Sequence, residues 1–117
     1  PMLPLIATET GRRDLGLGRA VELLSTTPAR LFGLHPRKGS LTPGADADIV
    51  IVDTSTKRTI DARELEYHEQ EKWSPYDGRE VDVWPVYTLL RGKLVFAEGE
   101  IRGAPGDGQF LPSGPGA

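Results

Sequence analysis

The residues that could hold a hydrolytic metal are few in this sequence. Such a centre needs several converging histidine or carboxylate ligands, commonly with two of them about two to four residues apart. The chain contains only two histidines, His35 and His68, and no cysteine. His35 precedes Pro36 just past an apolar helical stretch, whereas His68 lies among charged residues. We therefore predict that both are surface or capping residues and that the chain contributes no metal ligand.

The strongest paired-carboxylate pattern is Asp46-Ala47-Asp48, which follows a Pro-Gly turn and precedes a β-branched run. Alternate spacing places both side chains on one face if the strand already includes them, and two carboxylates on one face could bind a hard cation. Acidic residues in this position more often accept hydrogen bonds from nearby backbone amides at the end of a strand. We favour this second interpretation, and the first stays open.

Neither a catalytic serine nor a phosphate-binding loop is indicated. Ser25 and Ser74 are not in the Gly-x-Ser-x-Gly pattern that exposes a nucleophile on a sharp strand-to-helix turn. The glycine-rich stretch 103–108 follows a short strand pattern, but no helical pattern comes after it, so it lacks the helix N-terminus that cradles phosphate. We expect no catalytic and no cofactor-binding residue in this chain.

Four aromatic side chains could line a binding groove or fill a small core: Trp73, Tyr76, Trp84 and Tyr87. In a strand over 84–90, Trp84 and Tyr87 face opposite sides, so both faces of that strand carry apolar side chains. A chain of this length has little material to cover both faces. We therefore expect this strand to pack against a further segment or a second copy.

The elements that must position these residues change type along the chain. From Leu15 to Leu34 the apolar residues recur at helical spacing, and Thr27-Pro28 is typical of a helix start, so we predict two short helices separated by a break. Gly33 is expected to close the second helix in the left-handed conformation. Strands are predicted over 49–52, 84–91, 93–97 and 100–101, the middle two as a hairpin, with a loop or short surface helix over 54–82.

Composition excludes several classes of protein. The 117 residues with a formal net charge of −3 suit one small domain, and no run of like charge indicates binding to nucleic acid or to an anionic membrane. The apolar stretch near Pro1 is too short to span a bilayer and lacks the basic region of a secretion signal, and its abrupt start indicates an internal cut. The absence of cysteine fits a reducing compartment, so we predict a soluble, cytoplasmic protein.

Several segments, read in order, resemble the C-terminal portion of the cyclic-amide hydrolases of the amidohydrolase superfamily: hydantoinases, dihydropyrimidinases, allantoinases and dihydroorotases. The stretches that carry the resemblance are LSTTPARLFGL, RKGSLTPGADADIVIVD, WSPYDGREV, WPVYTLLRGKLVFAEGEIRG and PGDGQFL. The first two occur across many amidohydrolases. Ser74 to Gly78, followed by Trp84-Pro85-Val86, is more specific to the cyclic-amidase branch.

The resemblance implies an α+β fragment: residues 1–34 resemble the last helices of a (β/α)8 barrel, residues 35–111 part of a small β-sandwich, and 112–117 are expected to form a disordered tail. In this family the barrel holds one or two divalent metals, usually zinc, and a metal-bound hydroxide attacks the ring amide. The ligand-bearing strands lie upstream of the part that this chain matches. The implied partners are the missing barrel or another copy of the chain.

Two other functions remain open at this point. The chain could be a non-catalytic scaffold or oligomerisation module derived from the same family. It could also be a small β-rich ligand binder, which only its aromatic residues favour.

Overall fold

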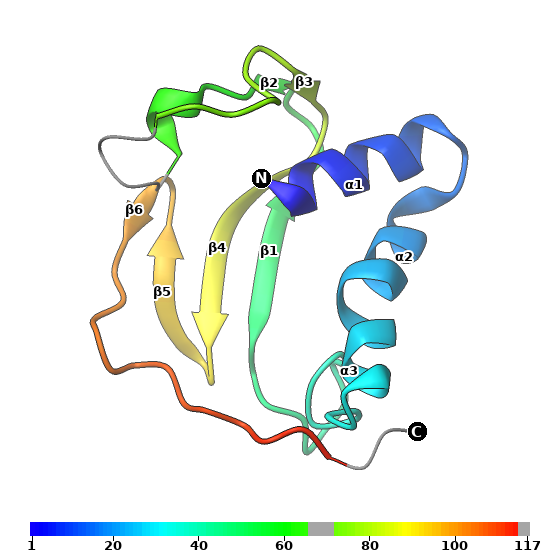
Figure 1. The fold of residues 1–117 in the computed structure, drawn as a ribbon, viewed down its shortest axis with the longest axis vertical. Coiled ribbons are helices and arrows are strands. Elements are labelled where there is room, and N and C mark those ends of the chain that lie inside the picture. The colour runs from blue at the N-terminus through cyan, green and yellow to red at the C-terminus, as the bar shows by residue number, and fades with distance from the viewer. Residues whose placement is uncertain (66–71, 115–117) are drawn as a thin grey trace.

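The first third of the chain is helical. The structure, a computed structural model, describes residues 1–65 and 72–114 (Figure 1). Its helical elements are α1 (Met2–Arg12), α2 (Gly16–Val21), the π-helical turn η1 (Glu22–Thr26) and α3 (Thr27–Leu31). A 3-10 turn, η2 (Ala62–Glu64), lies further along the chain.

Helix α1 was not indicated by apolar spacing, which begins only at Leu15. Its buried positions include Thr8 and Thr10 beside Pro4 and Ala7, so the buried face does not read as hydrophobic. Thr10 Oγ1 donates to the Ala7 carbonyl at 3.1 Å, which satisfies the hydroxyl inside the helix. Pro4 lies in the first turn, where a helix needs no amide hydrogen.

The predicted break between two helices is wrong, because the chain stays helical from α2 through η1 into α3. Thr27 has helical backbone angles and does not cap α3. Instead, the helical stretch widens into a π-helical turn before Pro28. Thr26 Oγ1, at the end of that turn, donates to the Gly39 carbonyl at 3.0 Å. We call α2, η1 and α3 together the helical arm. Gly33 ends this arm with a φ of 65°, as predicted.

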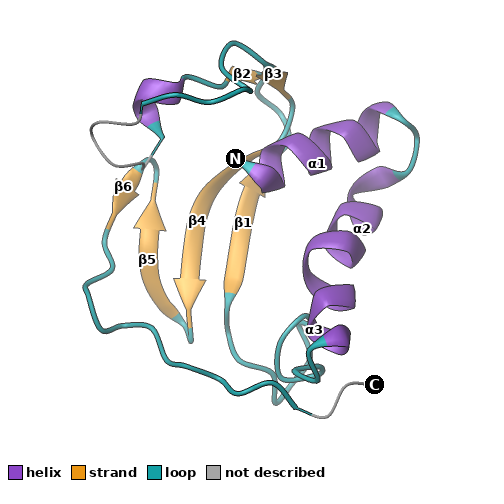
Figure 2. Cartoon of the chain, viewed as in Figure 1, coloured by secondary structure: helices purple, strands orange, loops and turns teal. Residues whose placement is uncertain are grey.

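The strands form one larger antiparallel sheet and one small pair. The larger sheet has the order β1-β4-β5-β6, and β2 pairs with β3 (Figure 2). The strand bounds are β1 Ile49–Asp53, β2 Arg58–Thr59, β3 Glu80–Val81, β4 Trp84–Leu90, β5 Lys93–Ala97 and β6 Glu100–Ile101. The predicted strands and the β4–β5 hairpin are confirmed. The β2–β3 pair was not predicted, because strands of two residues are too short to show an alternation of apolar and polar residues.

Register in the sheet is irregular where proline enters it. Val52 of β1 lies opposite Pro85 of β4, and the pairing shifts between Ile51 and Val52. Because proline has no amide hydrogen to donate to the ladder, a bulge at this place costs little. Within the described residues, β1 pairs on one side only and is therefore an edge strand.

A small core lies where α1 and α2 meet the sheet. Ala7, Ala20 and Val83 form its buried centre, with Ile6 and Val52 packed against it. Polar contacts add to this junction: Thr8 Oγ1 accepts from the Asp82 amide at 2.9 Å, and Arg12 Nε donates to Asp82 Oδ2 at 3.0 Å. Helix α1 is thereby held to the end of the sheet, while α2 and α3 extend along its side (Figure 1).

Candidate functional site

The paired carboxylates form an ionic clamp with Lys38. Lys38 Nζ lies 2.8 Å from Asp46 Oδ2 and also donates to Asp48 Oδ2. Arg37 Nε donates to Asp46 Oδ2 at 3.0 Å, and the Arg91 amide donates to Asp48 Oδ1 at 2.8 Å. The cation between the two aspartates is thus a lysine ammonium. Asp48 also fulfils the favoured role of accepting from a backbone amide at the strand end.

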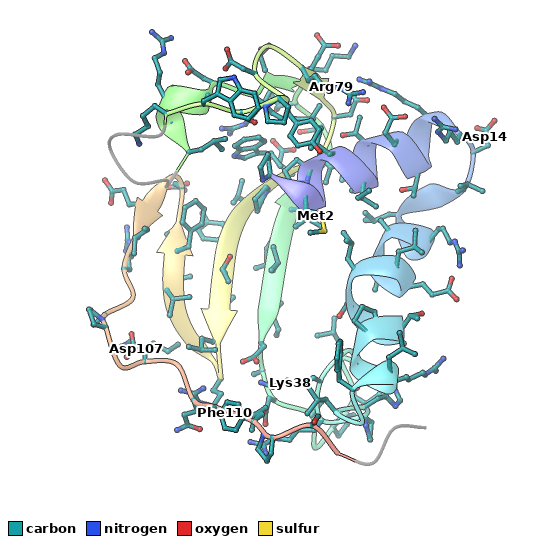
Figure 3. The ribbon with its side chains drawn as sticks, in the orientation of Figure 1. Met2, Asp14, Lys38, Arg79, Asp107 and Phe110 are labelled. Carbon is teal, nitrogen blue, oxygen red and sulfur yellow. The ribbon has the colours of Figure 1, made fainter. Side chains whose placement is uncertain are left out.

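The electrostatics of this clamp follow from its geometry. Hydrogen bonds from Lys38 lower the pKa of Asp46, and those to Asp46 and Asp48 raise the pKa of Lys38. Burial alone would raise the pKa of Asp48, but the Lys38 ammonium and the Arg91 amide outweigh it and lower the pKa. The clamp joins the loop after α3 to β1 and to the β4–β5 turn, near the end of the molecule where Figure 3 labels Lys38.

Acid is expected to weaken this clamp. Because the carboxyl pKa values are lower in the folded chain, their stabilisation is present above an unfolded pKa of about 4 and is lost as the pH falls through the lower folded values. The free energy of unfolding, measured by urea denaturation at a series of pH values, should therefore fall below about pH 4.

This fall in the free energy of unfolding should be smaller in a Lys38→Met variant. Lys57→Met, which breaks only the exposed pair with Glu80, is the control and should keep the wild-type slope. Equal slopes in all three proteins would contradict the assignment.

The other candidate catalytic residues are not brought together. His35 and Ser25 are exposed, and His68 lies outside the described residues. Ser74 is buried, and its Oγ accepts from the Tyr76 amide at 3.2 Å, so it stabilises a turn. Within residues 1–65 and 72–114, no group of three or more His, Cys, Asp or Glu side chains could hold a metal.

Asp77 and Gly78, at the end of the Ser74 to Gly78 turn, line an open cavity of about 620 Å³. The lining consists of residues 59–64, Lys72, Asp77 and Gly78. Asp77 Oδ1 accepts from the Ala62 amide at 2.7 Å, and Arg63 lies 2.6 Å from Asp61, whose pKa it lowers to about 2. A carboxylate with so low a pKa is too weakly basic to be an effective general base near neutral pH.

The aromatic residues divide between surface and sheet. Trp73 and Tyr76 are exposed, whereas Trp84 and Tyr87 are half-buried in β4. The Arg58 guanidinium lies over the Trp84 ring at 5.6 Å, and the Tyr87 hydroxyl donates to Glu98 Oε1 at 3.2 Å. Trp84 and Tyr87 thus contact other side chains of the fold.

Apolar side chains of the helical arm and of β1 remain exposed. The predicted apolar stripe of the helices is only partly buried: Ala20 and Ala29 are covered, but Leu17, Val21, Leu31 and Phe32 are exposed. On the edge strand, Val50 and Ile51 are each 47% exposed although they face opposite sides of the sheet. Such surfaces are typical of parts that pack against further protein.

Known proteins share the sequence motifs and the fold of this chain. The family model described as "Amidohydrolase family" matches residues 4–95, and the chain belongs to this family. It is 40% identical over 110 residues to an L-hydantoinase of Paenarthrobacter aurescens and 45% identical over 102 residues to a D-phenylhydantoinase of Escherichia coli O1:K1. These matches cover 93% and 87% of the chain but 24% and 21% of the two enzymes.

Solved structures give the same result. A dihydropyrimidinase from Brevibacillus agri NCHU1002 superposes with a TM-score of 0.89 at 30% identity, over 98% of this chain and 25% of that one. A D-hydantoinase gives 0.87 at 36% identity, over 95% of this chain and 24% of that one. The resemblance to the cyclic-amide hydrolases is confirmed, and the chain spans about a quarter of the length of the relatives it matches. No helix among the described residues is long and apolar enough to cross a membrane.

Proposed function

We propose that this chain is the C-terminal part of a metal-dependent hydrolase that opens cyclic amides of the hydantoin, dihydropyrimidine, dihydroorotate or allantoin type. The observation that carries the proposal is the match of 93% of the chain to 24% of a hydantoinase. Hydantoinase and dihydropyrimidinase relatives favour the first two substrate types. Dihydroorotate and allantoin rest on the sequence resemblance alone.

The catalytic metal, zinc in this proposal, is not held by the described residues. The two aspartates with suitable spacing are paired with Lys38, and Asp46 also with Arg37. His35 is exposed and does not join them in a group of ligands. A divalent site needs ligands whose charge and lone pairs are free to face the metal. The barrel that the family builds upstream would therefore supply the whole catalytic centre, and no catalytic step is assigned to this chain.

The role proposed for this chain is to complete the fold around that barrel. Residues 1–34 would pack as its last helices, and residues 35–111 would form part of a β-sandwich completed by strands from elsewhere in the protein. The exposed apolar residues of α2, α3 and β1 support this role, since burial of such surface stabilises an assembly. Of the tail proposed over 112–117, residues 115–117 lie outside the described residues, whereas the Gly114 amide donates to the Phe32 carbonyl. A cytoplasmic location is proposed from the absence of cysteine.

The isolated 117 residues are expected to self-associate, because among the described residues the β1 edge is unpaired and apolar side chains of the arm are exposed. Sedimentation should show species larger than a monomer that increase with concentration. An Ile51→Lys variant should reduce them, since a charge on an edge strand opposes pairing. Leu41→Lys, in a loop where Leu41 is already 78% exposed, is the matched control and should not. A compact monomer at every concentration would contradict this prediction.

The alternative is a non-catalytic scaffold of the same descent, which the lack of a metal-binding group among the described residues also fits. The two are distinguished by the upstream coding sequence and by assays of the complete gene product. The hydrolase predicts ring opening that a chelator abolishes and a divalent metal restores. The scaffold predicts no turnover with any of the four substrates.

A further inference from the structure

The segment after β6 crosses one end of the molecule, from the sheet to the helical arm (Figure 1). We call residues 102–114 the C-terminal strap. It leaves the sheet where the Arg102 and Gly103 amides donate to the Val95 carbonyl at 2.8 and 3.0 Å. It reaches the arm where the Gly114 amide donates to the Phe32 carbonyl, just past α3, at 3.0 Å. The strap therefore contacts both halves of the molecule.

Asp107 fastens the strap to the β4–β5 hairpin. Lys93 Nζ lies 2.8 and 2.9 Å from the two carboxylate oxygens of Asp107, and Oδ2 also accepts from the Ala104 amide at 2.7 Å. The Arg91 guanidinium donates to the Asp107 carbonyl at 2.6 Å. The Ala104 amide and the Lys93 ammonium lower the pKa of Asp107. Figure 3 labels Asp107 on the strap at the same end of the molecule as Lys38.

Two glycines fasten the strap to the end of α3. A Cβ on Gly114 would lie 2.5 Å from the Gly33 carbonyl oxygen, and a Cβ on Gly33 would lie 2.7 Å from the Gly114 carbonyl carbon. Gly33 has a φ of 65°, but Gly114 does not have a left-handed φ. At Gly114 it is therefore the close approach of two backbones, and not the local conformation, that excludes a side chain.

Apolar burial contributes little along the strap, since Phe110 is 91% exposed (Figure 3). Exposed polar contacts are individually weak, and segments that bury little apolar surface open at lower free energy than the core. The strap should thus open before the sheet does.

We propose that the C-terminal strap is a two-point clasp that holds the end of α3 to the sheet and opens while the sheet stays folded. Loss of either fastening, Asp107 or Gly114, then releases both the strap and the residues after α3. The proposal does not depend on the proposed hydrolase activity.

The test uses the complete gene product in two variants, each of which breaks a different fastening. Asp107→Asn removes the charge that Lys93 binds. Gly114→Ala pushes the backbone at 114 away from the backbone at Gly33. Two readouts are followed: chymotrypsin cleavage after Phe110, and hydrogen exchange of the amides at 32–35, which bond to carbonyls of α3. Both variants should raise both rates by about three- to tenfold and leave exchange in β4 and β5 unchanged.

Matched controls lie on or beside the same segment. Gly108→Ala places a Cβ where no heavy atom lies within 4 Å, and Glu100→Gln removes only a 3.8 Å pair with Arg102. Both should match the wild type. The proposal is overturned if Asp107→Asn and Gly114→Ala also match the wild type, if cleavage rises without faster exchange at 32–35, or if β4 and β5 lose protection at the same time.

Discussion

Replacing Gly39 with alanine is expected to lower the free energy of unfolding by about 2 to 5 kcal/mol. Gly39 has a φ of 74°, which costs a residue with a Cβ about 1 to 2 kcal/mol. The new Cβ would also lie 2.6 Å from the Ala29 Cβ and 2.9 Å from the Ser25 carbonyl oxygen. Neither neighbour is the flexible end of a long side chain, so the loop must move away from the helical arm, at a further cost of about 1 to 3 kcal/mol.

The matched control for this variant is Gly44→Ala. Gly44 lies in the same loop with a φ of 93°, but a Cβ there would have no heavy atom within 4 Å. It therefore measures the conformational cost alone, which should be about 1 to 2 kcal/mol. Urea denaturation followed by tryptophan fluorescence gives both values. If Gly39→Ala costs no more than Gly44→Ala, the loop does not pack on η1 and α3 as the structure shows.

The sheet was predictable from the sequence, whereas the details of the helices were not. The run from Ile49 to Val52 and the Arg91-Gly92 turn between two apolar stretches are local signals, and the structure follows them. Helix α1 is different, because its buried face includes Thr8 and Thr10, whose hydroxyls act in hydrogen bonds. The Thr27-Pro28 signal did not mark a new helix start, because a π-helical turn precedes the proline and the chain stays helical through it.

The candidate site shows where local patterns stop being informative. The position of Asp46 and Asp48 at the strand end could be predicted from turn chemistry, but their cation could not. Lys38 lies eight and ten residues earlier in a turn, a separation that no helical or strand period connects. Similarly, the spacing of Leu17 and Val21 predicted an apolar face, yet both side chains are exposed in the structure.

We propose that this chain completes a hydrolase whose catalytic centre lies in another part of the protein. The direct measurement is ring opening of hydantoin, dihydrouracil, dihydroorotate and allantoin by the purified 117 residues, with and without the upstream polypeptide supplied separately, alongside analysis of bound metal. Because no group of ligands converges among the described residues, the chain alone should bind no stoichiometric metal and give no turnover. Turnover of at least one substrate should occur only in the mixture. Metal-dependent turnover by the 117 residues alone would contradict the proposal that the catalytic centre lies elsewhere in the protein.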